Sequence, residues 1–420
     1  MSGGSKAKAA AAARGISIHS TRLQLVLYSF LLVLTPFILL QNFLVDMVGQ
    51  VSGSTLSIGG LRVPIVPLAA FVLLLAAAIR FRRAIKRRWL LAMGIVALLD
   101  ALAQQVTDIY FGHNFYDLQQ NWHYIAYGLF AFMVHRDLSP RGMPLARILW
   151  LTFALATAFS CFDEYFQLRM SSRVFDLSDT GKDILGSIMG MVIICVGGRR
   201  WQELLQGWRR IGSAGFRGAF SNPVIILAIM TAFDLIFLSV ASLLSDFEYA
   251  GAAVGITLSL TGLLLCALAL LFRPWGRILL AAAAAVLLVY LGYSHIRPRN
   301  THVSENRYGW TVYRGIPIPF FDLLVYPNGA FRLVDKKHYF NSRDQRFLLA
   351  QKSDIILIGT GDRGLGGKGF PEVASVQFLY NPHLARPTQV ILLRTPEACQ
   401  LFNRLKKEGK SVLFVLHNTC

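Results

Sequence analysis

The sequence predicts an all-α polytopic membrane helix bundle of about nine spans, followed by a small α/β domain. Of its 420 residues, 54% are hydrophobic and 15% are charged, which is too apolar for a soluble protein of this length. The excess of apolar side chains must therefore face lipid. From Arg297 onward the pattern changes to short alternating strands, which is typical of a soluble domain.

The formal net charge of +19 does not indicate nucleic-acid binding. A nucleic-acid-binding protein gathers its basic residues on one face of a soluble domain, whereas many of these stand in short runs between apolar segments. We therefore expect the lipid bilayer, and no nucleic acid, as the partner of the basic residues.

Nine apolar stretches come near the roughly 20 residues that a helix needs to cross a bilayer. The predicted spans are Leu23 to Met47, Val63 to Ile79, Trp89 to Gln105, Trp122 to Val134, Ile148 to Phe162, Ile184 to Val196, Val224 to Leu244, Ala250 to Phe272 and Ile278 to Ser294.

Loop charge predicts the orientation, because Lys and Arg are retained in the cytoplasm. Basic residues precede the first span and fill the loops after the second, fourth, sixth and eighth spans, whereas residues 245–249 carry none. This pattern indicates a multi-pass protein of the inner cell membrane with a cytoplasmic N-terminus. Nine spans would leave the C-terminal domain outside.

The chain then divides into five segments. They are a basic cytoplasmic tail over 1–22, a membrane bundle over 23–200, a basic cytoplasmic loop over 201–221, three further spans over 222–295 and a soluble α/β domain over 296–420. In the last segment we expect strands at Trp310 to Tyr313, Phe331 to Val334, Asp354 to Gly359 and Ser411 to His417, and a helix at Pro396 to Glu408 capped by Thr395.

Residues 161–190 concentrate the carboxylates of the bundle in the run CFDEYFQLRMSSRVFDLSDTGKDILGSIMG. If the fifth helix continues, Asp163 and Gln167 lie one turn apart on one face. Asp176, Asp179 and Asp183 share another stripe at i, i+3 and i+7. The stripe therefore predicts a polar site at the outer membrane boundary.

Carboxylates at this boundary are costly unless they meet a cation or water. They could bind a divalent metal, hold the nearby Arg173 or carry out acid–base chemistry. The alternative is a solvated cap on two helices, without any chemical role.

These residues resemble the signature of the VanZ family, in the order Asp163, Glu164, Gln167, Arg173, Asp176, Asp179, Gly186 and Gly190. Upstream, QQNWHYIAYGLFAF resembles the family segment in which a His opens a helix and a Tyr follows one turn later, here His123 and Tyr127. Gln119 and Gln120 stand where the family commonly has Asp and Lys, and Asp183 stands where it commonly has Asn. The resemblance covers about Val63 to Val196 and implies a link to teicoplanin susceptibility.

Roles can be assigned on this hypothesis. His123 could carry protons, since the unperturbed pKa of histidine is near neutral. Acid–base groups or ligands for a hard cation such as Mg²⁺ would be His123, Asp163, Glu164 and Asp179. Substrate would be bound by Tyr127, Gln167, Arg173, Asp176 and Asp183, with Arg173 on a phosphate.

Two further carboxylates fall inside predicted spans, Asp100 with Gln104 one turn later, and Asp234. An intramembrane carboxylate is a functional suspect, and the alternative is a protonated or hydrogen-bonded structural acid. Gly186 and Gly190 form a small-xxx-small stripe, which predicts close approach of another helix.

The Gly-rich stretch IGTGDRGLGGKG predicts a tight turn after a strand. A phosphate loop would need Ser or Thr at Gly369, so at most its backbone N–H groups could hold an anion. Together with TPEACQLFNRLKKEGKSVLFVLHNTC, this stretch resembles a small uncharacterised α/β domain family that includes a mitochondrial complex I assembly factor. The resemblance covers about the last 110 residues and implies a three-layer fold with a binding or scaffold role.

The sequence therefore leaves two alternative functions. In the first, an envelope membrane protein uses an outward polar pocket to bind or process a lipid-linked, phosphate-bearing or peptidoglycan-related molecule. In the second, the bundle is a non-catalytic anchor or scaffold, and the C-terminal domain recruits a protein partner.

Overall fold

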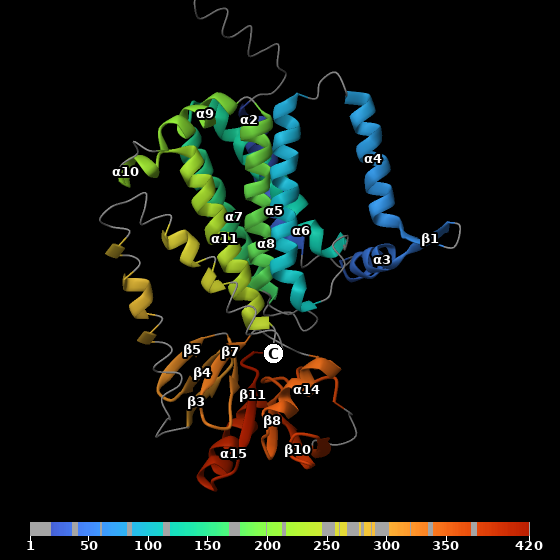
Figure 1. Cartoon of the computed structure of the whole chain (residues 1–420), viewed down its shortest axis with the longest axis vertical. Coiled ribbons are helices and arrows are strands. Elements are labelled where there is room, and N and C mark those ends of the chain that lie inside the picture. Colours follow the sequence, from blue (N-terminus) through green and yellow to red (C-terminus); the bar gives the residue numbers. More distant parts are fainter. Residues whose placement is uncertain are drawn as a thin grey trace, which may run out of the picture. The chain divides into compact units, whose positions relative to one another are not determined.

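The computed structural model forms two compact units, one of residues Met1–Asp163 with Ser178–Leu238 and one of Glu164–Leu177 with Ser239–Cys420 (Figure 1). It describes residues 18–35, 41–58, 61–81, 86–111, 118–167, 177–198, 200–211, 216–245, 257–259, 261–266, 277–278, 281–286, 288–289, 302–319, 321–334, 339–370 and 376–419.

The first unit is built of helices. In chain order its elements are α2 (Ile18–Leu34), α3 (Gln41–Gly53), the hairpin β1 (Thr55–Ile58) with β2 (Leu61–Pro64), α4 (Ile65–Phe81), α5 (Arg87–Phe111), α6 (Leu118–Leu138), α7 (Leu145–Gln167), α8 (Leu177–Val192) with a π-helical turn at Ile193–Gly197, α9 (Trp201–Arg209), α10 (Phe216–Ala219) and α11 (Pro223–Ser245). The end of α7 from Glu164 and the end of α11 from Ser239 belong to the second unit.

Four of the described helices are long and apolar enough to cross a membrane, which fits a membrane protein. They contain the segments Arg87–Thr107, Leu145–Gln167, Leu177–Gly197 and Pro223–Ala241. Nine spans are thus not supported. Of the last two predicted spans, Ala250 to Phe272 and Ile278 to Ser294, large parts lie outside the described residues.

The other three predicted spans differ for local reasons. Leu23 to Met47 becomes two shorter helices, since α2 ends at Leu34 and α3 begins at Gln41, and Pro36 between them removes a backbone donor. At Val63 to Ile79 the helix α4 has 17 residues, so it counts among the shorter apolar helices. The apolar middle of α6 is flanked by polar residues, including His123 near its start and Asp137 near its end, so its average apolarity falls.

Contact between α6 and α8 depends on two glycines. A Cβ added to Gly186 would lie 2.7 Å from the Cα of Tyr124, and one added to Gly190 would lie 2.5 Å from the carbonyl oxygen of Gly128. The predicted close approach of a helix to this stripe is therefore confirmed. Similarly, a Cβ on Gly181 would lie 2.5 Å from Leu238 of α11.

The second unit confirms a C-terminal β-sheet region. Its strands are β3 (Val303–Arg307), β4 (Trp310–Tyr313), β5 (Ile316–Pro319), β6 (Asp322–Val325), β7 (Phe331–Val334), β8 (Ile355–Gly359), β9 (Val376–Asn381), β10 (Arg386–Leu393) and β11 (Val412–Leu416). Six form a mixed sheet in the order β7-β6-β11-β8-β10-β9, in which β8 runs parallel to β10 and β11, and β3-β4-β5 form a separate sheet.

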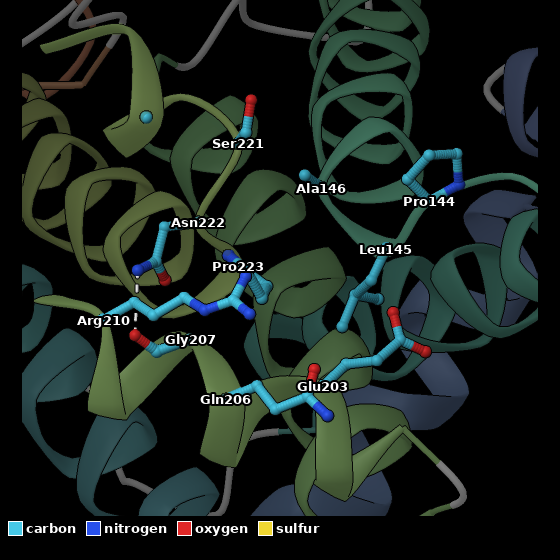
Figure 2. Close-up of a pocket in the computed structure, with 11 residues that line it drawn as sticks. Pro144, Leu145, Ala146, Glu203, Gln206, Gly207, Arg210, Ser221, Asn222 and Pro223 are labelled. Atoms are coloured by element: carbon cyan, nitrogen blue, oxygen red, sulfur yellow. Dashed lines mark hydrogen bonds between the residues drawn. The ribbon is translucent and has the colours of Figure 1, made fainter. Parts of the chain in front are cut away.

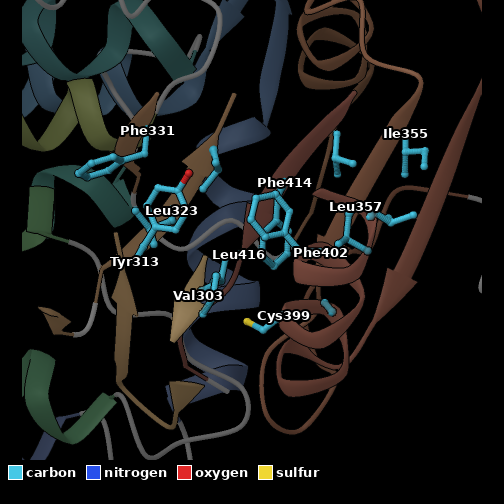
Figure 3. Packing of buried hydrophobic residues seen from close by; sticks show 14 of the residues in the cluster. Val303, Tyr313, Leu323, Phe331, Ile355, Leu357, Cys399, Phe402, Phe414 and Leu416 are labelled. Atoms are coloured by element: carbon cyan, nitrogen blue, oxygen red, sulfur yellow. The ribbon is translucent and has the colours of Figure 1, made fainter. Parts of the chain in front are cut away.

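Hydrophobic side chains fill both faces of the six-stranded sheet, as the period of two in a strand requires. On one face, strand residues such as Leu357 and Phe414 pack with Phe402 of α15 (Thr395–Lys407) and Tyr313 of the small sheet (Figure 3). On the other face, a second cluster packs with Leu348 of α14 (Ser342–Ala350). The sheet is thus covered on both sides.

The start of α15 corrects one prediction, because Thr395 is the first helical residue and not the cap, which is Arg394. The Thr395 hydroxyl donates to the carbonyl of His417 at 2.6 Å and accepts from the N–H of Gly361 at 2.9 Å. The N–H of Gly366 is also used internally, by the carbonyl of Thr360. These two donors of the Gly-rich loop therefore stabilise the loop and are not aimed at an anion.

Candidate functional site

Three helices bring polar side chains together at one end of the first unit. His123 lies on the first turns of α6, Ser160 on the last turns of α7, and Asp183 on the second turn of α8. The Nδ1 atom of His123 lies 2.8 Å from one carboxylate oxygen of Asp183, and the Ser160 hydroxyl donates to the other at 2.7 Å. Asp183 therefore joins α6 and α7 through α8.

A second pair lies beside this one on α8. Lys182 donates to a carboxylate oxygen of Asp179 at 2.9 Å and also to the side-chain carbonyl of Gln120. The Nε2 atom of His123 lies 3.7 Å from Asp179, which is an ionic contact and too long for a hydrogen bond. We call His123, Ser160, Asp179, Lys182 and Asp183 the polar cluster.

Exposure divides the polar cluster into an inner and an outer part. The side chains of Asp183 and Lys182 are 3% and 6% exposed, whereas those of His123 and Asp179 are 22% and 24% exposed. A molecule approaching the cluster would therefore meet His123 and Asp179 first. Asp183 lies behind the imidazole ring.

This arrangement can support acid–base chemistry. A buried carboxylate at Nδ1 fixes the tautomer and orientation of a histidine ring, so that Nε2 can accept and release a proton. Here Nε2 is the atom on the side of Asp179. Ser160 already donates to Asp183, so its hydroxyl serves to hold the carboxylate.

Lys182 is the charged residue of the polar cluster that the sequence does not single out. Arg173 was expected to neutralise the carboxylates, but Lys182 is the cation that contacts Asp179 within the described part of the chain. The sequence signal that points to it is a lysine three residues after Asp179 and directly before Asp183, at the start of an apolar run.

The other predicted residues are placed as follows. Glu164 is buried and accepts from Gln167 at 3.0 Å, so Gln167 pairs with Glu164 one turn back, while Asp163 is half-buried. Tyr127 is buried and packs against Phe130 in the bundle core. Arg173 and Asp176 lie outside the described residues.

Metal binding gains no support from the residues with described positions, since no group of three or more His, Cys, Asp or Glu side chains among them could hold a metal ion. Lys182 already places a positive charge against Asp179.

The two intramembrane acids have different surroundings. Asp100 accepts from Gln104 at 3.1 Å, and Gln104 also donates to Asn121 of α6, so Asp100 fits a hydrogen-bonded structural acid. Asp234 is fully buried, and neither of its carboxylate oxygens has a hydrogen-bond partner among the described residues. It lies close enough to Asp183 for their charges to interact.

No comparison with known proteins assigns this chain to a family. No family model matches the chain, and no curated protein matches it. The solved structure described as "MT938" aligns with a TM-score of 0.23 and 24% identity, covering 29% of this chain and 100% of that one.

Proposed function

We propose that this chain is a cell-envelope membrane protein that binds or processes a lipid-linked or peptidoglycan-related molecule at the polar cluster. The observation that carries the proposal is the His123 ring, held at Nδ1 by buried Asp183 while its other nitrogen faces the partly exposed Asp179. A structural ion pair would not need a partly exposed histidine in front of it.

The positions of charges along the helices support an outward-facing site. The polar cluster lies near the start of α6 and α8 and the end of α7, whereas basic residues stand at the opposite helix ends, such as Arg87 at the start of α5 and Arg141 before α7. Because basic loops stay in the cytoplasm, the cluster is proposed to face outward, with the N-terminus inside.

In the proposed mechanism, His123 takes or gives a proton at Nε2, and Asp183 positions the ring. Lys182 keeps Asp179 in place as a carboxylate. Arg173 is proposed to hold a phosphate of the substrate, as the VanZ resemblance implies.

Replacing His123 with Gln tests the proposal. With the purified full chain in lipid nanodiscs and an undecaprenyl-pyrophosphate-linked peptidoglycan precursor as probe, we expect turnover to fall roughly 100-fold or more, the usual contribution of a general acid–base residue. Teicoplanin susceptibility of cells expressing the variant should return to that of cells lacking the protein.

The matched control is Asp137→Asn, which alters a buried carboxylate at the other end of α6, paired with Arg141 at 2.7 Å. It should leave turnover and susceptibility unchanged. If His123→Gln instead lowered membrane abundance while the remaining protein kept full turnover, or if the wild-type chain neither bound nor changed the probe, the proposal would be wrong.

We also propose that the C-terminal domain lies on the outer side of the membrane, opposite the cytoplasmic N-terminus. This proposal depends on the number of spans. In a cysteine-free chain, exposed Lys410→Cys should react with a membrane-impermeant maleimide in intact cells, whereas Arg209→Cys at the end of α9 should react only after permeabilisation. Reaction of both only after permeabilisation would place the domain in the cytoplasm.

The scaffold alternative also has an observation in its favour. Strand β9 is an edge of the six-stranded sheet, and its Phe378 and Tyr380 side chains are strongly exposed. An edge strand offers unpaired backbone groups to another strand, and exposed aromatic residues favour interfaces. Under this alternative Tyr380→Glu would disrupt function, and His123→Gln would not.

A further inference from the structure

A pocket of about 420 Å³ lies at the other end of the bundle, among the basic loops (Figure 2). Its volume is within the range of small-molecule sites. It is lined by the start of α7, one side of α9, α10 and the turn that opens α11. Its polar side chains are Glu203, Gln206, Arg210, Ser221 and Asn222. None of these residues belongs to the polar cluster.

The wall between α9 and α11 is held by one buried side chain. Asn222 donates to the carbonyl of Gly207 at 2.9 Å and accepts from the N–H of Val224 at 3.0 Å. A Cβ on Gly207 would lie 2.8 Å from the Asn222 side-chain oxygen, so a larger residue at this position would have to displace the Asn222 side chain. The pocket is therefore a built feature of the fold.

The pocket carries one positive and one negative charge. Figure 2 shows Arg210 beside Asn222 and Glu203 beside Leu145, with Gln206 between them. The Glu203 carboxylate is partly exposed and accepts from Arg200 at 2.5 Å through one oxygen. This pair of opposite charges suits a zwitterion better than a purely anionic molecule.

Aromatic residues of the kind that favour lipid headgroups lie beside the pocket. Trp150 donates from its indole N–H to the carbonyl of Phe220 at 3.1 Å and stacks on that ring, one residue before Ser221 in the pocket wall. Phe220 and Trp208 are exposed. Trp with neighbouring Arg is typical of the membrane–water interface.

We propose that this pocket binds the phosphoethanolamine headgroup of a phospholipid from the cytoplasmic leaflet. Arg210 contacts the phosphate, because guanidinium and phosphate form charge-assisted hydrogen bonds. Glu203 accepts from the primary ammonium, which a trimethylated choline cannot donate to it. The acyl chains extend into the bilayer beside α7 and α11.

Lipid binding to the purified full chain, measured by native mass spectrometry with added phospholipids, tests the proposal. We expect phosphatidylethanolamine to bind about tenfold more tightly than phosphatidylcholine or phosphatidylglycerol, as one charged hydrogen bond provides. Arg210→Gln should weaken its binding about tenfold, and Glu203→Gln should abolish the preference over phosphatidylcholine.

Two controls make the result specific. Arg209→Gln changes the neighbouring exposed arginine, which does not line the pocket, and should have no effect. Arg200→Gln removes the partner of Glu203 and should leave the preference in place. Equal loss with Arg209→Gln, or equal binding of phosphatidylglycerol, would refute the proposal.

Competition by a soluble compound identifies the source of the headgroup. Glycerophosphoethanolamine has the headgroup without acyl chains. It should fail to compete with phosphatidylethanolamine at the concentrations at which the lipid saturates the pocket. Competition by the soluble compound would show that the pocket takes a free metabolite and would overturn the lipid assignment.

Discussion

Replacing Gly190 with valine is expected to separate α6 from α8 and to destabilise the bundle by about 3 kcal/mol or more. An added Cβ would lie 2.5 Å from the carbonyl oxygen and 2.9 Å from the Cα of Gly128, and 3.1 Å from the Cβ of Ala131. Two of these three atoms are backbone, so a rotamer change of a side chain cannot relieve the clash. We expect a much smaller folded fraction after heating, measured by size-exclusion chromatography in detergent.

The matched control is Gly94→Val in α5, where an added Cβ meets nothing within 4 Å. The two variants share the same change in helix propensity, so the difference between their stabilities reports the α6–α8 contact. Equal melting of both variants would show that this contact does not hold the bundle. Because the same helices carry His123 and Asp183, the first variant should also lose any activity of the polar cluster.

Replacing Phe402 with alanine is expected to destabilise the C-terminal domain by about 3–5 kcal/mol. Its ring is fully buried and stacks on Phe414 with 4.9 Å between ring centroids, and it packs near Tyr313 at 6.4 Å. Truncation leaves a cavity between α15 and the central strands that a rigid sheet cannot fill. Hydrogen exchange in the full chain should show faster exchange of β8 and β11.

Phe378→Ala provides the control for the same chemical change. Phe378 is 69% exposed on β9, so its truncation should alter stability by about 0.5 kcal/mol or less. If Phe402→Ala left the exchange rates of both central strands at wild-type values, the central position of this ring in the core would be disproved.

Burial also explains why Cys399 is a poor reporter of solvent accessibility. Cys399 is buried on α15, and burial raises the pKa of its thiol to about 12. The thiol therefore stays protonated and unreactive near neutral pH, and accessibility experiments need introduced cysteines such as the one at position 410.

Sequence patterns predicted the local elements well where a single period dominates. The strands Trp310–Tyr313 and Phe331–Val334 appear with the predicted bounds, because short runs rich in aromatic and β-branched residues between turn residues favour a strand. The spans were predicted less well. Apolar length alone cannot show that a run forms two helices, as α2 and α3 do, or that its ends are too polar, as in α6.

The sequence by itself determined the apolar helices, the C-terminal β-sheet region and the run of carboxylates on α7 and α8. Only the tertiary structure decided which of these carboxylates work together. His123 and Asp183 are 60 positions apart, and they meet because Gly186 and Gly190 let two helix backbones approach. No spacing rule within one helix can predict such a contact, since it depends on the packing between helices.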